Sequence, residues 1–234
     1  MRSSSPRPRG FLGPSSTVTA RETLAKGGLS GGARPRLDVR LFLDITQGMG
    51  LAGAAGVRPF LPALLSGALA RADLGLDFEH TRYAFLESTW FLIAVVVLLI
   101  ITVVIERRRP GAAESGAYGA ALGGVAVGIG ALLFAGSLAD NGETSWAWLA
   151  PGIACALLGQ AAARSLFGRV AKRLDAEARL ALPLYADGGS LAAAGLAVLI
   201  PPVSILILIF FGWLWIGGRR RTDETYEGLR SLTK

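Results

Sequence analysis

Two long runs without a charged residue constrain the fold more than any other feature of this sequence. Ser88–Ile105 and Ser115–Ala139 contain no Asp, Glu, Lys or Arg. Uncharged runs of 18 residues or more are typical of membrane-spanning helices, because a helix satisfies its backbone hydrogen bonds internally where no water can do so. The sequence therefore predicts an all-α fold: a polytopic transmembrane helical bundle with about five membrane segments.

The charge of the chain is basic and comes almost wholly from arginine. The net charge is +7, and arginines outnumber lysines 21 to 3. A soluble protein with this balance would suggest a nucleic-acid partner. Here the basic residues lie between apolar runs, which is the pattern of cytoplasmic loops in membrane proteins. We therefore expect the lipid bilayer of the cell membrane, and not nucleic acid, as the partner.

The chain divides into three parts by composition. Residues 1–37 hold seven basic residues, with Glu22 as the only acidic one, and are too polar to bury a core, so we expect a disordered basic tail on the cytoplasmic side. Residues 38–218 form the transmembrane helical domain, and residues 219–234 form a polar C-terminal tail. The middle part holds ordinary spans at Trp90–Ile105, Ser115–Ala139 and Trp146–Phe167, and Arg169–Leu182 is expected to be one amphipathic surface helix.

The first membrane segment, Leu41–Ala70, is overlong and carries one arginine beside two prolines. Pro59 and Pro62 lack the N–H that a helix interior needs, so the helix should break or kink there. Two alternatives stay open. As one tilted helix, the segment places Arg58 near the boundary opposite Asp44; as a re-entrant hairpin, it places Arg58 near the tip, at mid-depth.

The last membrane segment, Gly188–Ile216, is also interrupted, by Pro201 and Pro202. A single crossing would leave Arg219–Arg221 on the outer side, against the preference of basic residues for the cytoplasm. A re-entrant hairpin that turns at the two prolines, with halves too short to span alone, would return these arginines to the inner side, and we favour it. Broken segments in both halves of a membrane protein are typical of transporter sites, although prolines also kink ordinary packed helices.

The membrane segment Ser115–Ala139 is unusually rich in glycine. Gly119 and Gly123, and Gly124 and Gly128, form two patterns of small residues four apart, which allow close helix packing. We predict that this face is buried at backbone-contact distance. The partner helix can belong to the same chain, which we favour, or to a second copy in a homo-oligomer.

One motif resembles a known family. Gly56-Val57-Arg58-Pro59-Phe60-Leu61-Pro62 resembles the first-segment signature of an uncharacterised bacterial membrane family, domain of unknown function 4126. The resemblance covers roughly residues 41–217 and includes Glu106, which closes the second span, and Asp187, which opens the last. The family often continues past that glutamate with an Asp-Lys…Pro motif, where this chain has Arg107–Pro110. Because the family has no established activity, the resemblance implies a fold and not a mechanism.

The candidate polar site consists of Arg58, Asp44, Asp187 and Glu106, because ionisable residues within a membrane are costly and often functional. Two functions stay open: permeation of a small solute or ion, with Arg58 offering its charge to an anion, or a structural or lipid-interacting scaffold. An enzyme is not expected. His80 is the only histidine and Cys155 the only cysteine, so a metal site or a histidine-dependent triad lacks its parts, and no cofactor is expected.

Overall fold

The computed structural model describes residues 34–76, 78, 81–109, 116–139, 146–171 and 173–230, with the backbone alone at 34–38, 176 and 219–230. The predicted tail at 1–37 lies almost entirely outside these residues. The chain divides into two units, Met1–Val39 and Arg40–Lys234. One helix, Arg34–Val57, has its first six residues in the first unit and continues into the second.

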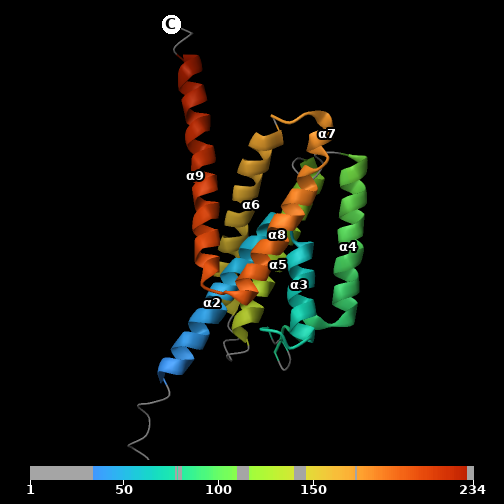
Figure 1. Cartoon of the computed structure of the whole chain (residues 1–234), viewed down its shortest axis with the longest axis vertical. Helices are drawn as coiled ribbons and strands as arrows, with labels where there is room; N and C mark the ends of the chain where they lie inside the picture. The colour runs from blue at the N-terminus through green and yellow to red at the C-terminus, as the bar shows by residue number, and fades with distance from the viewer. Residues whose placement is uncertain are drawn as a thin grey trace, which may run out of the picture. The chain divides into compact units, whose positions relative to one another are not determined.

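The described residues are helical and contain no strand, as predicted for an all-α bundle (Figure 1). Within the described part of the chain, four helices are long and apolar enough to cross a membrane, at Thr89–Arg108, Gly116–Ala139, Trp146–Ala171 and Glu177–Leu199. The protein is therefore membrane-embedded. The elements are α2 (Arg34–Val57), α3 (Phe60–Arg71), η1 (Ala84–Glu87), α4 (Thr89–Arg108), α5 (Gly116–Ala139), η3 (Trp146–Trp148), α6 (Leu149–Ala171), α7 (Ala176–Arg179), α8 (Leu182–Leu199) and α9 (Val203–Arg230).

The first membrane segment is a hairpin with one long arm and one short arm. Helix α2 ends at Val57 and α3 begins at Phe60, and α3 runs back toward the end where α2 starts (Figure 1). The side-chain amide of Gln47 donates to the carbonyl of Gly75 at 2.9 Å, which places the loop after α3 beside the first half of α2. Of the two alternatives for this segment, the structure has the hairpin.

The expected helix break at Pro62 is wrong. Pro62 is the third residue of α3, and the first turn of a helix has no intrahelical acceptor for its N–H groups. A proline is therefore tolerated there, and only Pro59 interrupts the segment.

The last membrane segment reverses direction at its prolines. Helix α8 ends at Leu199, Pro201 and Pro202 occupy a turn, and α9 begins at Val203 and runs beside α6 (Figure 1). Val198 lies against Gly75, whereas the hydroxyl of Ser165 on α6 donates to the carbonyl of Leu214 on α9 at 3.1 Å. The chain therefore runs from one end of the bundle to the other and returns. It reverses at the prolines as expected, but its first arm belongs to a helical stretch, Glu177–Leu199, that is long and apolar enough to cross a membrane, where a re-entrant hairpin has arms too short to cross.

The surface helix expected over Arg169–Leu182 is interrupted. Helix α6 continues to Ala171, and α7 covers only Ala176–Arg179 before α8 begins at Leu182. The guanidinium of Arg179 donates to the carbonyl of Leu174 at 3.1 Å, across the turn that precedes α7.

The closest backbone packing between helices involves glycines outside the two predicted pairs. A Cβ at Gly159 would lie 2.1 Å from the carbonyl oxygen of Gly53, so α2 and α6 cross at backbone contact. Gly124 and Gly128 are exposed, and beyond the backbone of α5 itself no described heavy atom lies within 4 Å of a Cβ at either one. The predicted packing of Gly124 and Gly128 within the chain is therefore wrong for the described part of the chain.

The other predicted pair does face the interior. Gly119 and Gly123 are buried. The atoms nearest to a Cβ at Gly123 are the side-chain ends of Gln160 and Arg164, at 2.3 and 3.1 Å. Long polar side chains of α6 therefore cover this position, and not a second backbone.

Candidate functional site

The site begins with the two residues that separate α2 from α3. The N–H of Arg58 still donates to the carbonyl of Ala54 at 3.1 Å, so Arg58 completes the last turn of α2. Pro59 has no N–H to continue the helix, and the chain turns into α3. Arg58 thus lies at the tip of the hairpin, beside the C-terminal end of α2, where the helix dipole favours a cation.

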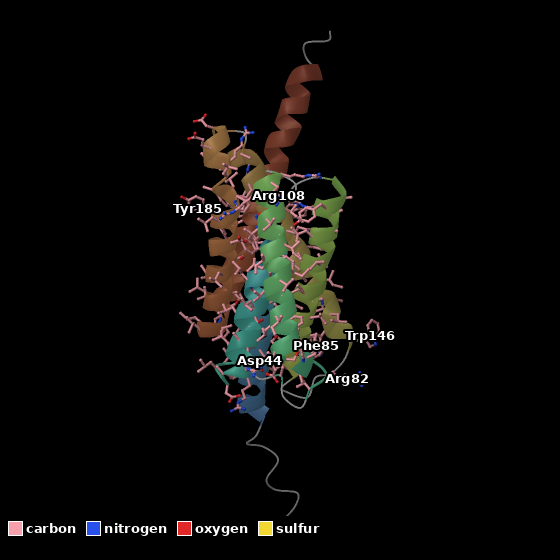
Figure 2. All side chains as sticks on the ribbon, turned by 90° about the vertical axis from the view of Figure 1, so that its right-hand side faces the viewer. Asp44, Arg82, Phe85, Arg108, Trp146 and Tyr185 are labelled. Atoms are coloured by element: carbon pink, nitrogen blue, oxygen red, sulfur yellow. The ribbon has the colours of Figure 1, made fainter. Side chains whose placement is uncertain are left out.

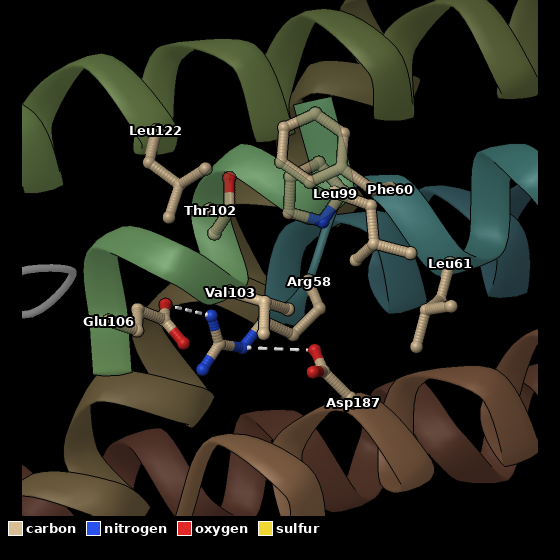
Figure 3. Close-up of a pocket in the computed structure, with 10 residues that line it drawn as sticks. Arg58, Phe60, Leu61, Leu99, Thr102, Val103, Glu106, Leu122 and Asp187 are labelled. Atoms are coloured by element: carbon tan, nitrogen blue, oxygen red, sulfur yellow. Dashed lines mark hydrogen bonds and ion pairs between the residues drawn. The ribbon is translucent and has the colours of Figure 1, made fainter. Parts of the chain in front are cut away.

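Two carboxylates from two other helices meet this guanidinium (Figure 3). Nη1 of Arg58 donates to Oε1 of Glu106, in the last turn of α4, and forms an ion pair with it. Nε of Arg58 lies 3.4 Å from Oδ1 of Asp187 on α8. The guanidinium therefore links the hairpin tip to α4 and α8 through two of its edges. We call Arg58, Glu106 and Asp187 the charge triad.

The charge triad is largely withdrawn from the surface. The exposed fractions of the side chains are 14% for Arg58, 7% for Glu106 and 20% for Asp187. Glu106 lies 16 residues beyond Trp90 on α4, about 24 Å along the helix axis. The triad is therefore near the arginine-rich end of the bundle and not at mid-depth, where the hairpin alternative placed Arg58.

The comparison with known families rests on the same part of the chain. Residues 45–221 match the family described as Domain of unknown function (DUF4126). The chain belongs to the DUF4126 family. Neither a curated protein nor a solved structure matches it. The match includes all three residues of the charge triad, as the resemblance of the Arg58 motif implied.

Asp44, the fourth predicted member of the polar site of this DUF4126 protein, is not part of the triad. The hydroxyl of Ser137, near the C-terminal end of α5, donates to the carbonyl of Asp44 at 3.1 Å. Figure 2 shows Asp44 at the same end as Arg82 and Trp146, and Arg108 and Tyr185 toward the opposite end. Fourteen residues of α2 separate Asp44 from Arg58, which amounts to about 21 Å.

The charge balance of the triad is negative in the ordinary ionisation states. One guanidinium faces two carboxylates, which leaves an excess of one negative charge where the dielectric constant is low. Glu106 also lies in the last turn of α4, where the helix dipole disfavours a carboxylate. The arginine offsets part of this cost, and a proton or a small cation would offset the rest.

The space around the triad is small and mostly apolar. A cavity of about 10 Å³ lies beside the three charged residues, which is at the lower limit for one water molecule. The other residues that line it come from the hairpin tip, α4 and α5, and are Pro59, Phe60, Leu61, Leu99, Thr102, Val103 and Leu122 (Figure 3). In this conformation the site is closed to any solute larger than water.

The described residues offer little for covalent or metal chemistry. None of their His, Cys, Asp and Glu side chains gather in a group of three that could hold a metal ion. The hydroxyl of Ser190 donates to the carbonyl of Asp187 at 2.9 Å, and the hydroxyl of Ser204 is buried with no hydrogen-bond partner among these residues. No described histidine stands beside either serine, because the single histidine, His80, lies outside these residues.

Sequence reasoning missed the crossing of α2 and α6 that supports the hairpin. Gly56 lies two residues before Arg58, and a Cβ there would lie 2.0 Å from the carbonyl oxygen of Ala156. The usable signals were Gly53 and Gly56 in the first segment, and Ala156 and Gly159, likewise three residues apart, in α6. Small residues at such spacing allow helix backbones to approach.

Proposed function

We propose that this DUF4126 protein is a permeation protein for a small solute or ion, and that the charge triad is the gate of its pathway. The observation that carries the proposal is the ion pairing of Arg58, at the break between α2 and α3, with Glu106 and Asp187 on two other helices. Ionisable residues withdrawn from the surface of a membrane bundle typically mark ion or proton pathways.

The charge balance favours a cation or a proton over the anion that Arg58 alone would suggest. An anion would meet two carboxylates within reach of the same guanidinium. A proton on one carboxylate, or a cation beside it, would weaken the hold of the triad on the hairpin tip. The tip could then move and open the site, so that occupancy and opening would be coupled.

The arrangement of the two hairpins supports this proposal. The turn between α8 and α9 lies near Gly50 and Gly75, whereas the tip between α2 and α3 faces Asp187 near the start of α8. The two hairpins thus point in opposite directions. Broken helices that meet in a bundle supply the polar groups of many transporter sites.

A structural role is the second candidate, and the closed cavity favours it. A volume of about 10 Å³ holds no solute, and the triad would then serve only to fix the hairpin tip against α4 and α8. A scaffold of this kind needs neither transport nor catalysis. The two candidates differ in one respect, since only permeation requires that the triad open.

Orientation in the cell membrane belongs to the same proposal. The C-terminal ends of α4 and α6 lie toward the same end of the bundle (Figure 1). They carry Arg107 and Arg108, with Arg109 just after α4, and Arg164 and Arg169, and we place that end in the cytoplasm. Because α2 runs toward this end, Arg40 would then lie on the outer side. This placement runs against the expected cytoplasmic N-terminal tail.

Flux through reconstituted protein tests the function. Liposomes with the full chain would be challenged in turn with gradients of protons, Na⁺, K⁺ and Cl⁻, with an internal pH-sensitive dye for protons and an ion-selective dye for each other ion. We expect cation or proton flux above that of protein-free liposomes, and a higher flux in Arg58→Ala, because this change removes the cation that holds the hairpin tip closed. Flux at the protein-free level for all four ions, in protein that keeps its helical circular dichroism, would favour the scaffold.

A further inference from the structure

A large open groove lies on the surface of α6, beside α9 and away from the charge triad. Its volume is about 850 Å³, within the range of ordinary ligand sites. Most of the lining comes from α6, from Ala154 to Arg169, and α9 contributes Trp215 and Gly218. Figure 1 shows α6 and α9 side by side along this stretch.

The groove is apolar over one part and basic at one end. Ala154, Leu157 and Leu158 line the apolar part, and Arg164 and Arg169 line the basic end. No acidic residue lines the groove, and neither arginine forms an ion pair with any residue whose side chain is described. The groove thus presents two positive charges that described acidic groups do not neutralise.

The two arginines flank the groove, Arg164 on the side of α5 and Arg169 on the side of α9. One Nη of Arg164 lies 3.1 Å from a Cβ position at Gly123 on α5, and one Nη of Arg169 lies 3.8 Å from that at Gly218 on α9. Both glycines lack a side chain that would push the guanidinium away. Two guanidiniums held apart in this way can contact the oxygens of one phosphate from two directions.

The dimensions fit one leaflet of a bilayer. Ala154 and Arg164 are ten residues apart, about 15 Å along the helix axis, which is half the thickness of the hydrocarbon. The apolar part therefore has the length of one leaflet, and the basic end lies at the level of the headgroups. Trp215 lines this same end, where an indole favours the interface.

We propose that this groove binds one anionic glycerophospholipid. Its phosphate lies between Arg164 and Arg169, and an acyl chain lies along Ala154, Leu157 and Leu158. A zwitterionic lipid would bring its own positive group to the same arginines and bind more weakly. The inference is independent of the proposed permeation, since no residue of the charge triad lines the groove.

Native mass spectrometry of the full chain in detergent measures the bound lipid directly. The protein would be titrated separately with phosphatidylglycerol and with phosphatidylcholine of the same acyl chains. We expect one phosphatidylglycerol to be retained at concentrations where phosphatidylcholine is not. The double variant Arg164→Gln/Arg169→Gln should lower the affinity for phosphatidylglycerol by about 25-fold, about fivefold for each basic residue.

The matched control is Arg173→Gln/Arg179→Gln, which removes two exposed arginines at the same end that do not line the groove. It should keep the affinity of the wild type. Ala154→Phe fills the apolar part without changing charge, and should weaken both lipids. If Arg164→Gln/Arg169→Gln fails to fold, the lipid affinity of Ala154→Phe tests the proposal in its place.

Three results would overturn the proposal. The first is equal retention of the two lipids by the wild type. The second is an equal loss of affinity in the groove variant and in the charge-matched control, which would show an effect of net charge alone. The third is an unchanged affinity for phosphatidylglycerol in Ala154→Phe, or release of the bound lipid by millimolar inorganic phosphate. Either result would mean that the groove holds only a phosphate and not the acyl chain.

Discussion

The crossing of α2 and α6 gives a sharp test of the packing that holds the hairpin in place. We consider Gly159→Ala, which adds one methyl group to α6. Its Cβ would lie 2.1 Å from the carbonyl oxygen of Gly53, while ordinary contact begins at 3.4 Å. The obstructing atom belongs to the backbone of α2, so no side-chain rotation can relieve the contact. The two helices must separate by about 1.3 Å.

The expected cost follows from two opposing effects. Overpacking of a close-packed interior costs about 1–3 kcal/mol, and a contact between backbones belongs at the upper end. Replacing a helical glycine with alanine contributes about 1 kcal/mol in the other direction. We therefore expect Gly159→Ala to lower the free energy of unfolding by about 2 kcal/mol.

Gly124→Ala is the matched control, because Gly124 lies inside α5 and a Cβ there meets no described atom within 4 Å. The control should be neutral or more stable than the wild type by up to about 1 kcal/mol. Reversible unfolding in mixed micelles with increasing dodecyl sulfate, followed by circular dichroism, measures both variants. Equal stabilities of the two variants would refute the backbone contact, since the helix-propensity gain cancels between them.

Three further predictions concern the hairpins and their contacts. Arg58→Gln should lower the free energy of unfolding by about 3 kcal/mol, because it leaves the buried carboxylate of Glu106 and the partly buried carboxylate of Asp187 without their cation, whereas Arg173→Gln should change it little. Gln47→Leu removes the hydrogen bond to Gly75 and should cost about 1 kcal/mol in the same assay, and an unchanged stability would contradict that contact. Cysteine labelling in a Cys155→Ala background tests the hairpin between α8 and α9. Leu74→Cys and Leu199→Cys should react with an impermeant thiol reagent from one side of the membrane, and Arg109→Cys from the other. Labelling of Leu199→Cys and Arg109→Cys from the same side would contradict this hairpin.

The sequence was most informative about the membrane-spanning helices. The uncharged runs that predicted spans at Trp90–Ile105 and Ser115–Ala139 correspond to α4 and α5, because length and apolarity alone fix such helices. Trp146–Phe167 corresponds to η3 followed by α6. Proline effects were less predictable, since the same residue breaks a helix interior at Pro59 and is harmless in a first turn at Pro62.

The candidate site was predicted in part. Arg58, Glu106 and Asp187 stood out as ionisable residues beside apolar runs, and the fold brings them together. Asp44 stood out for the same reason, but the length of α2 carries it to the opposite end. Composition locates ionisable residues along the chain, whereas their pairing depends on how far each hairpin arm extends before it turns.

The packing surfaces were the least accessible to sequence reasoning. The glycine patterns in α5 are real, but which side of a helix faces the bundle depends on its rotation, and the pattern alone does not fix that rotation. Gly53 and Gly56 on α2 make the closest backbone approaches, to Gly159 and Ala156 on α6. Such a contact depends on two segments a hundred residues apart, and neither reveals it alone.

The central claim is that the charge triad gates a pathway for a cation or a proton. Flux of protons, Na⁺ and K⁺ into liposomes that contain Asp187→Asn tests it most directly, because this change removes the excess negative charge and leaves the ion pair of Arg58 with Glu106. Asp175→Asn, at an exposed residue outside the triad, is the control. We predict that Asp187→Asn abolishes the wild-type flux and that Asp175→Asn preserves it. Equal flux in the two variants, both folded, would contradict the claim.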